Sequence, residues 1–195
     1  MRSTGSGAHE VVLDACVLLN LAATGSLAEI LKASFLSVAV PDAVVAEVRW
    51  LRRGGRGEDR DELDRVDLRP LVEAGVLRIT ELAGDGVLAL FVHLAAEIDD
   101  GEAAAAALAL STGATLATDD RKCRRVVSAV APGCELTDTP ECLAAWVRRC
   151  GVADADAGVA LRRIEDRARY WPPRAHPLCG WWEGLLGSEP GEPPR

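Results

Sequence analysis

Short apolar runs alternate with helical patterns along most of the chain, and this alternation constrains the fold more than any other feature. The runs predicted to be strands are 11–13, 36–40, 76–80 and 114–118. The segments predicted to be helices are 15–31 (broken at 25–26), 42–53, 87–97, 100–110, 119–130 and 140–150. Strands that alternate with helices favour a parallel sheet covered by helices on both faces. The sequence therefore predicts a three-layer α/β fold with a central parallel sheet.

The length of the chain, 195 residues, suits one such domain followed by an extension. We assign the α/β domain to residues 10–150. Residues 151–187 are predicted to be a helical, tryptophan-rich extension, with Leu161, Ile164 and Ala168 at helical spacing. Residues 188–195 are predicted to be a disordered tail.

Composition excludes several other classes of protein. No apolar run is long and uncharged enough to span a membrane, and the first nine residues lack the apolar core of a signal peptide. The protein is therefore expected to be cytoplasmic, with no membrane partner. None of the six cysteines forms a CxxC pair, so zinc knuckles are not expected. No glycine-rich nucleotide-binding motif follows the first predicted strand.

The net charge of −8 does not by itself indicate a nucleic-acid-binding protein. A site built from carboxylates contributes to that charge and becomes less acidic once a cation binds. Arginines cluster within 49–60 and 121–125, and most of them are expected to lie on solvated helix faces.

Carboxylates recur where the predicted strands end, which is where open parallel sheets bind their ligands. Asp14 follows the first strand, and Asp119 and Asp120 follow the fourth. Glu102 lies in the first turn of an alanine-rich helix, and Glu47 lies at the edge of an apolar helical stripe. Each acid alone has a simpler explanation as a helix cap, a first-turn acid or an ion-pair partner. Together they predict a site for Mg²⁺ or Mn²⁺, which prefer oxygen ligands and support phosphodiester hydrolysis.

At these acids the sequence resembles the PIN-domain family, which includes the VapC toxins of bacterial toxin–antitoxin pairs. The resemblance covers residues 10–150 and rests on four ordered segments: VVLDACVLL (11–19), PDAVVAEV (41–48), DGEAAAAALA (100–109) and LATDDRK (116–122). It implies a metal-dependent endoribonuclease whose catalytic, metal-binding acids are Asp14, Glu47, Glu102 and Asp119, with Asp120 as an alternative to Asp119. Cys16 departs from the family, in which many members have serine or threonine at that position.

The same resemblance suggests partners and further site residues. Single-stranded or structured RNA would be the substrate, and an antitoxin or a second copy of the chain would be protein partners. Thr118 or Asn20 would orient the attacking water, and Arg121 or Arg124 would hold phosphates of the substrate. The main alternative is a catalytically inactive PIN domain that binds protein or RNA. A receiver-like phosphoryl-transfer domain ranks last, because Asp14 lacks an acidic neighbour and no lysine is well placed.

Overall fold

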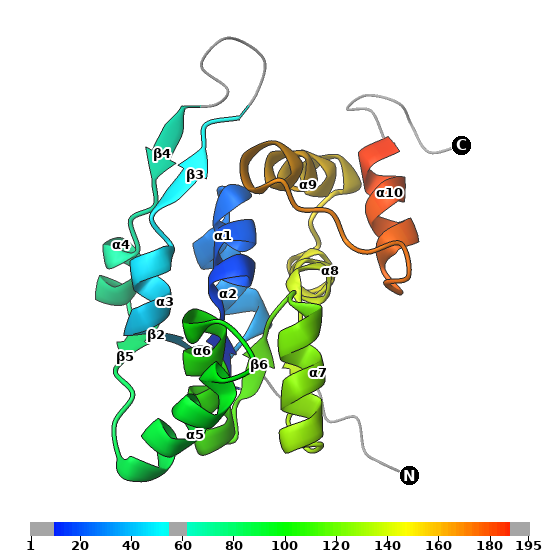
Figure 1. The fold of residues 1–195 in the computed structure, drawn as a ribbon. Helices are drawn as coiled ribbons and strands as arrows, with labels where there is room; N and C mark the ends of the chain where they lie inside the picture. Colours follow the sequence, from blue (N-terminus) through cyan, green and yellow to red (C-terminus); the bar gives the residue numbers. More distant parts are fainter. Residues whose placement is uncertain (1–9, 55–61, 188–195) are drawn as a thin grey trace.

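In the part of the chain that the computed structural model describes, residues 10–54 and 62–187, five parallel strands form a central sheet (Figure 1). The strand order is β5-β2-β1-β6-β7. The strands are β1 (Glu10–Leu13), β2 (Ser37–Pro41), β5 (Arg78–Thr80), β6 (Thr115–Ala117) and β7 (Leu136–Thr137). Helices flank this sheet, which confirms the predicted three-layer α/β class.

The central strand β1 is short, and its last three residues are apolar because they are covered on both faces of the sheet. Val11, Val12 and Leu13 have no exposed surface. Leu13 pairs with Ala117 of β6, so these two neighbouring strands end level with each other. The acids that follow the two strands therefore emerge at the same edge of the sheet.

The helices cover the sheet and one another. α6 packs against β1, β2 and β6 and against α5, whereas α1, α2 and α8 pack together. No single described helix is long and apolar enough to cross a membrane; α1 and α2 meet that test only as a pair bent by 120°. The helix bounds are α1 (Ala15–Ala23), α2 (Leu27–Ser34), α3 (Asp42–Glu47), α4 (Arg69–Glu73), α5 (Asp85–Ala95), α6 (Asp100–Thr112), α7 (Arg121–Val130), α8 (Thr139–Cys150), α9 (Asp154–Ala168) and α10 (Cys179–Gly187).

The predicted helix over 42–53 is wrong in its second half. α3 ends at Glu47, and the chain continues as strand β3 (Trp50–Arg52), which pairs antiparallel with β4 (Leu63–Arg65). Leu51 is buried while its neighbour Trp50 is 52% exposed, which is the two-residue alternation of a strand. The apolar spacing fits a helix equally well, and the pairing with β4 decides between them.

The C-terminal helices lie against the rest of the described fold. α9 packs on α1 and on β3, and α10 packs on α9 (Figure 1). Leu161 and Ile164 of α9 are buried, as their helical spacing predicts, and Trp182 of α10 has no exposed surface. The predicted disordered tail, 188–195, lies outside the described residues.

Candidate functional site

Asp14 lies at the centre of the candidate site. Its backbone N–H donates to the Ala117 carbonyl oxygen (3.1 Å), which joins the ends of β1 and β6. Its Oδ1 accepts from the Val17 N–H at 2.8 Å and so caps α1. The side chain is only 1% exposed, and among the described residues its Oδ2 has no hydrogen-bond partner. A buried carboxylate oxygen without a partner is costly, so this atom is poised for a cation or a proton.

Burial raises the pKa of Asp14 to about 7. The neighbouring Thr118 side chain and the Val17 N–H oppose this rise, whereas the negative charges of Asp119 and Glu102 add to it. The Asp14 carboxyl is therefore only partly ionised at neutral pH unless a positive charge lies beside it.

Four acids surround one point on the first turn of α1, where Cys16 lies on the surface. Desolvation of the sulfur and, to a smaller extent, the charges of nearby carboxylates together raise the pKa of the Cys16 thiol to about 12. Those carboxylates belong to Asp14, Asp119, Glu102 and Asp120. The acids predicted from the ends of β1 and β6 and from the start of α6 thus come together.

Asp119 is held by four hydrogen bonds. Its Oδ1 accepts from the Thr139 N–H (3.0 Å) and from the Tyr170 hydroxyl (3.1 Å). Its Oδ2 accepts from Asn20 Nδ2 (2.9 Å) and from Thr139 Oγ1 (2.6 Å). Burial raises the pKa of Asp119, and these donors counteract the rise. Both oxygens of Asp119 are therefore committed to neighbouring side chains and backbone.

Asp120 differs from its neighbour. It is the N-cap of α7, with Oδ1 accepting from the Cys123 N–H at 2.7 Å. Within the described part of the chain, its Oδ2 has no hydrogen bond. Glu102 is half-buried, and its pKa is raised by burial first and then by the charges of Asp120 and Asp99. Asp120 and Glu102 therefore face each other closely enough to repel.

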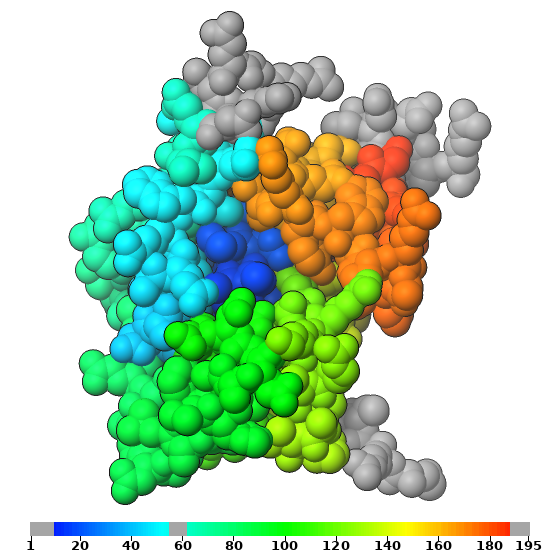
Figure 2. Space-filling view, viewed as in Figure 1, coloured from blue at the N-terminus to red at the C-terminus, as the bar shows by residue number. Residues whose placement is uncertain are grey.

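Glu47, the last residue of α3, reaches the same region from another side. Its carboxylate lies against Gly101, immediately before Glu102, where a Cβ would be 2.7 Å from Glu47 Oε2. Burial raises the pKa of Glu47, and the charges of Asp99 and Asp100 raise it further. Figure 2 shows α1 (blue) at the bottom of a recess bordered by α3 (cyan), α6 (green) and the C-terminal segment (orange). Glu47 thus belongs to the rim of the site.

The predicted substrate-contacting residues have different surroundings. Asn20 and Thr118 are buried; Asn20 donates to Asp119, and Thr118 Oγ1 accepts from the Asp120 N–H (3.2 Å). Arg124 donates to the carbonyl oxygens of Thr118 and Thr137 at 3.1 and 3.0 Å, so it braces β6 against β7. Arg121 is exposed at the start of α7.

The sequence did not predict two residues that donate hydrogen bonds to Asp119 and that come from segments beyond β1 and β6. Thr139 follows the two-residue strand β7, which was not predicted, and Tyr170 lies beyond α9. Nearby, His176 Nε2 lies 3.0 Å from Oδ2 of Asp138, the N-cap of α8. The Asp138–Thr139–Pro140 sequence is a helix-start signal that could have located Thr139. No local signal identifies Tyr170.

No three Asp, Glu, His or Cys side chains among the described residues are already grouped tightly enough to hold a metal ion. Like charges at short range repel, so a set of carboxylates is expected to close up only around a cation. The unpartnered Asp14 oxygen and the oxygen-only donors nonetheless fit a hard divalent cation.

Gly101 offers a test of the contact with Glu47. In Gly101→Ala the new methyl group would displace the Glu47 carboxylate, which is the mobile end of a side chain. We expect the melting temperature to change little, while the affinity for Mn²⁺, measured by calorimetry, falls several-fold. Gly86→Ala, whose added Cβ meets nothing within 4 Å, is the control. Unchanged Mn²⁺ affinity in Gly101→Ala would remove Glu47 from the site.

Comparisons with known proteins place this geometry in context. A family model described as "DUF3368: PIN domain" matches residues 10–173. No curated protein matches the chain. Among solved structures, the chain is similar to the "Crystal structure of PAE2754 from Pyrobaculum aerophilum", with 22% sequence identity and a TM-score of 0.42. That match covers 76% of this chain and 95% of the other.

Proposed function

This chain belongs to the PIN-domain family, and on that premise we propose that it is a magnesium- or manganese-dependent endoribonuclease. PIN domains are generally nucleases that use divalent metal ions and bind nucleic acids.

The observation that carries the proposal is the buried Asp14 carboxylate with one unpartnered oxygen. It lies beside Glu102 and the Asp119–Asp120 pair, at the edge where β1 and β6 end. A purely structural helix cap needs one oxygen, and Oδ1 already fills that role for α1. The second oxygen is buried at a cost that a cation or a proton would offset, and the neighbouring carboxylates favour the cation.

We assign the metal-binding role to Asp14, Glu102, Asp120 and Glu47. When bound, a divalent cation lowers the pKa of water and offsets charge on a phosphate. Asp119 we assign to positioning, because its two oxygens accept four hydrogen bonds within the protein. Asn20 and Thr118 would act through the aspartates that they contact, and Arg121 remains the candidate for a phosphate contact.

The alternative is an inactive PIN domain that binds protein or RNA. Two of the acids support it, since Asp14 and Asp120 both serve as N-caps and would persist for that reason alone. A role as the toxin of a toxin–antitoxin pair remains a prediction from the sequence resemblance, and the formation of a homodimer remains a prediction from the tryptophan-rich C-terminal segment.

Titration with metal separates the two functions. Mg²⁺ or Mn²⁺ should raise the melting temperature, because a ligand that binds the folded state stabilises it. The rise should be larger at pH 8 than at pH 6. The pKa of Asp14 is near 7 in the fold, so protons compete with the cation below that pH and not above it.

The control is Asp14→Asn, which should lose most of the metal-induced rise at pH 8. An unchanged melting temperature of the natural protein at millimolar metal and pH 8 would favour the inactive module. A rise that is equal at the two pH values would exclude Asp14 as a ligand.

A further inference from the structure

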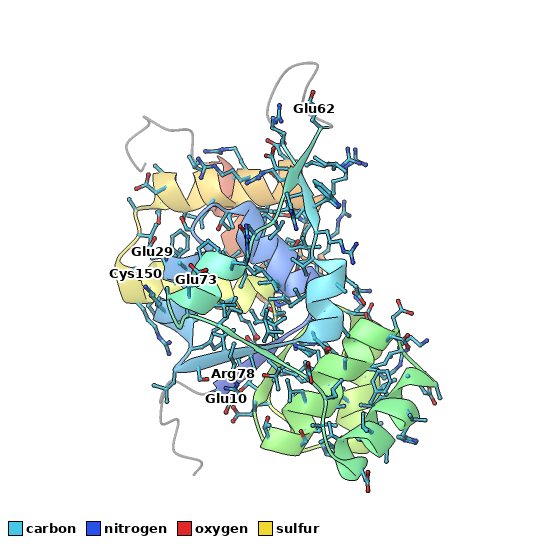
Figure 3. The ribbon with its side chains drawn as sticks, turned by 90° about the vertical axis from the view of Figure 1, so that its left-hand side faces the viewer. Glu10, Glu29, Glu62, Glu73, Arg78 and Cys150 are labelled. Carbon is cyan, nitrogen blue, oxygen red and sulfur yellow. The ribbon has the colours of Figure 1, made fainter. Side chains whose placement is uncertain are left out.

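The hairpin β3–β4 presents one face to the fold and the other to solvent. Leu51 and Asp64 are paired across the hairpin; Leu51 is buried, and Asp64 forms an ion pair with Arg167 of α9. Trp50 and Arg65 are also directly paired, and they lie on the opposite face because side chains alternate along a strand. Trp50 and Arg65 are both exposed. Figure 3 shows the hairpin extending away from the sheet, with Glu62 at its far end.

A groove of about 490 Å³ lies at the base of this outer face. One side of the groove is formed by α3 and the residue that follows it, which contribute Val45, Ala46 and Val48. Ile79 of the edge strand β5 adds an exposed apolar side chain. We call it the Trp50 groove and define it by its exposed residues: Ala46, Arg49, Trp50, Arg65, Asp67, Arg69 and Ile79.

The charge of the groove is opposite to that of the whole protein. Arg49, Arg65 and Arg69 line it together with a single acid, Asp67, which pairs with Arg69 at 2.6 Å. Neither Arg49 nor Arg65 forms a salt bridge with any described residue. In a chain of net charge −8, this local positive excess is complementary to a polyanion.

An exposed tryptophan between arginines suits a nucleic-acid strand better than a protein partner. Bases stack on aromatic side chains, and arginines contact the flanking phosphates. Tryptophan and arginine are also enriched at protein interfaces, so it is the local positive excess, matched to a chain of phosphates, that favours the nucleic-acid strand. The groove also accommodates an unpaired strand more readily than a duplex, because stacking on Trp50 requires an unstacked base.

The groove and the candidate site are adjacent along the chain at the end of α3. The Arg49 N–H donates to the Glu47 carbonyl oxygen at 2.9 Å, so the turn that ends α3 also begins the groove. Glu47 and Trp50 are three residues apart, which limits the distance between their Cα atoms to about 11 Å. A strand bound at Trp50 therefore lies close to Glu47, at the rim of the site.

We propose that the Trp50 groove binds single-stranded RNA, with a base stacked on Trp50 and adjacent phosphates held by Arg49 and Arg65, and delivers the strand past Glu47. This assignment rests on the proposed ribonuclease function and adds to it the substrate form and the surface that recognises it.

Binding should be measured with a fluorescently labelled, mixed-sequence single-stranded RNA in the presence of a chelator, so that affinity is separated from cleavage. Trp50→Ala should weaken binding by roughly 5- to 100-fold, the range for loss of one stacked base, and Trp50→Phe should restore most of it. Arg65→Ala should reduce the slope of log K against log salt by about 0.7, the contribution of one single-strand phosphate contact. Leu36→Ala and Arg148→Ala, at exposed positions outside the groove, are the matched controls.

The outcomes distinguish this inference from the proposed function. If Trp50→Ala and Arg65→Ala bind the strand as the natural protein does, the groove is excluded even if the protein cleaves RNA. If both weaken binding but the protein cleaves no RNA with Mg²⁺ or Mn²⁺, the groove stands and the ribonuclease assignment falls. Equal weakening on duplex RNA would overturn the single-strand assignment. A change in sedimentation with unchanged RNA affinity would assign the surface to a second copy of the chain.

Discussion

Replacing Asp14 with asparagine should reduce RNA cleavage by about 100-fold or more while the fold survives. Loss of groups that merely orient metal ligands costs 10- to 100-fold in affinity or activity, so loss of a direct ligand should cost at least that much. Asparagine retains an oxygen that can accept the Val17 N–H, so the cap of α1 is kept. Cleavage is measured on single-stranded RNA with saturating Mn²⁺, and folding by circular dichroism.

Stability gives a second measurement on the same variant, made without metal. The pKa of Asp14 rises from 3.8 in the unfolded chain to about 7 in the fold. The stability cost of this shift, on the order of 4 kcal/mol, is therefore absent below about pH 4, where the folded and unfolded states are both protonated, and fully present above pH 7, where both are ionised. The unfolding free energy of the natural protein should fall between pH 4 and pH 7, and the fall should be smaller in Asp14→Asn, which keeps only the contributions of Glu47, Glu102 and Asp119.

The matched control is Asp85→Asn, which removes an exposed first-turn acid from α5. It should cleave RNA like the natural protein. Full activity in a clean preparation of Asp14→Asn would refute the site, whereas a fall of similar size in Asp85→Asn would point to a general charge effect.

The centre of the site could be predicted because its signals are local. A short apolar run followed directly by Asp14 gives both the strand and the acid, and the same holds for β6 and the Asp119–Asp120 pair. Parallel strands then bring these residues to one edge without further information. The alanine-rich helix with Glu102 in its first turn is equally local.

What the sequence could not provide comes from contacts between distant residues. Adjacent aspartates look equivalent in sequence, and they differ in the structure because Tyr170, 51 residues away, donates to Asp119 and not to Asp120. The helix predicted to continue past Glu47 fails because β3 pairs with β4, a strand that begins only at Leu63. The exposure of Trp50 follows from that pairing, so the Trp50 groove could not be seen in the sequence either.

Truncation after Gly151 should abolish stable folding, which is the largest structural effect we expect. The cut removes Leu161, Ile164 and Trp182, all buried. Shortening one such side chain costs about 2–5 kcal/mol, and a whole domain has only about 5–15 kcal/mol of stability. Aggregation and loss of a cooperative thermal transition are the expected results.

The polar contacts of α9 reinforce this expectation. Arg163 donates to the Thr24 carbonyl oxygen at 2.9 Å, beyond the C-terminal end of α1. Arg167 donates to the carbonyl oxygens of Ala23 (3.2 Å) and Arg52 (3.0 Å), so one guanidinium joins α1 to the hairpin. Without α9 these carbonyl groups lose their donors, and both the helix that carries the cap Asp14 and the strand that carries Trp50 lose support.

Two further variants show how the loss of stability depends on which part of the C-terminal segment is removed. Truncation after Gly187 removes only residues 188–195 and should leave the melting temperature unchanged. Trp182→Ala, in the full chain, should lower the unfolding free energy by about 3–5 kcal/mol without abolishing the transition.

The truncation after Gly151 also tests the predicted domain boundary at residue 150. A protein cut after Gly151 that stays folded but changes its sedimentation would make the C-terminal segment a docking element, because its apolar face would then be needed by a partner and not by the domain. If sedimentation and stability are both unchanged, the segment contributes nothing to the fold, and the packing of α9 on α1 has no energetic consequence.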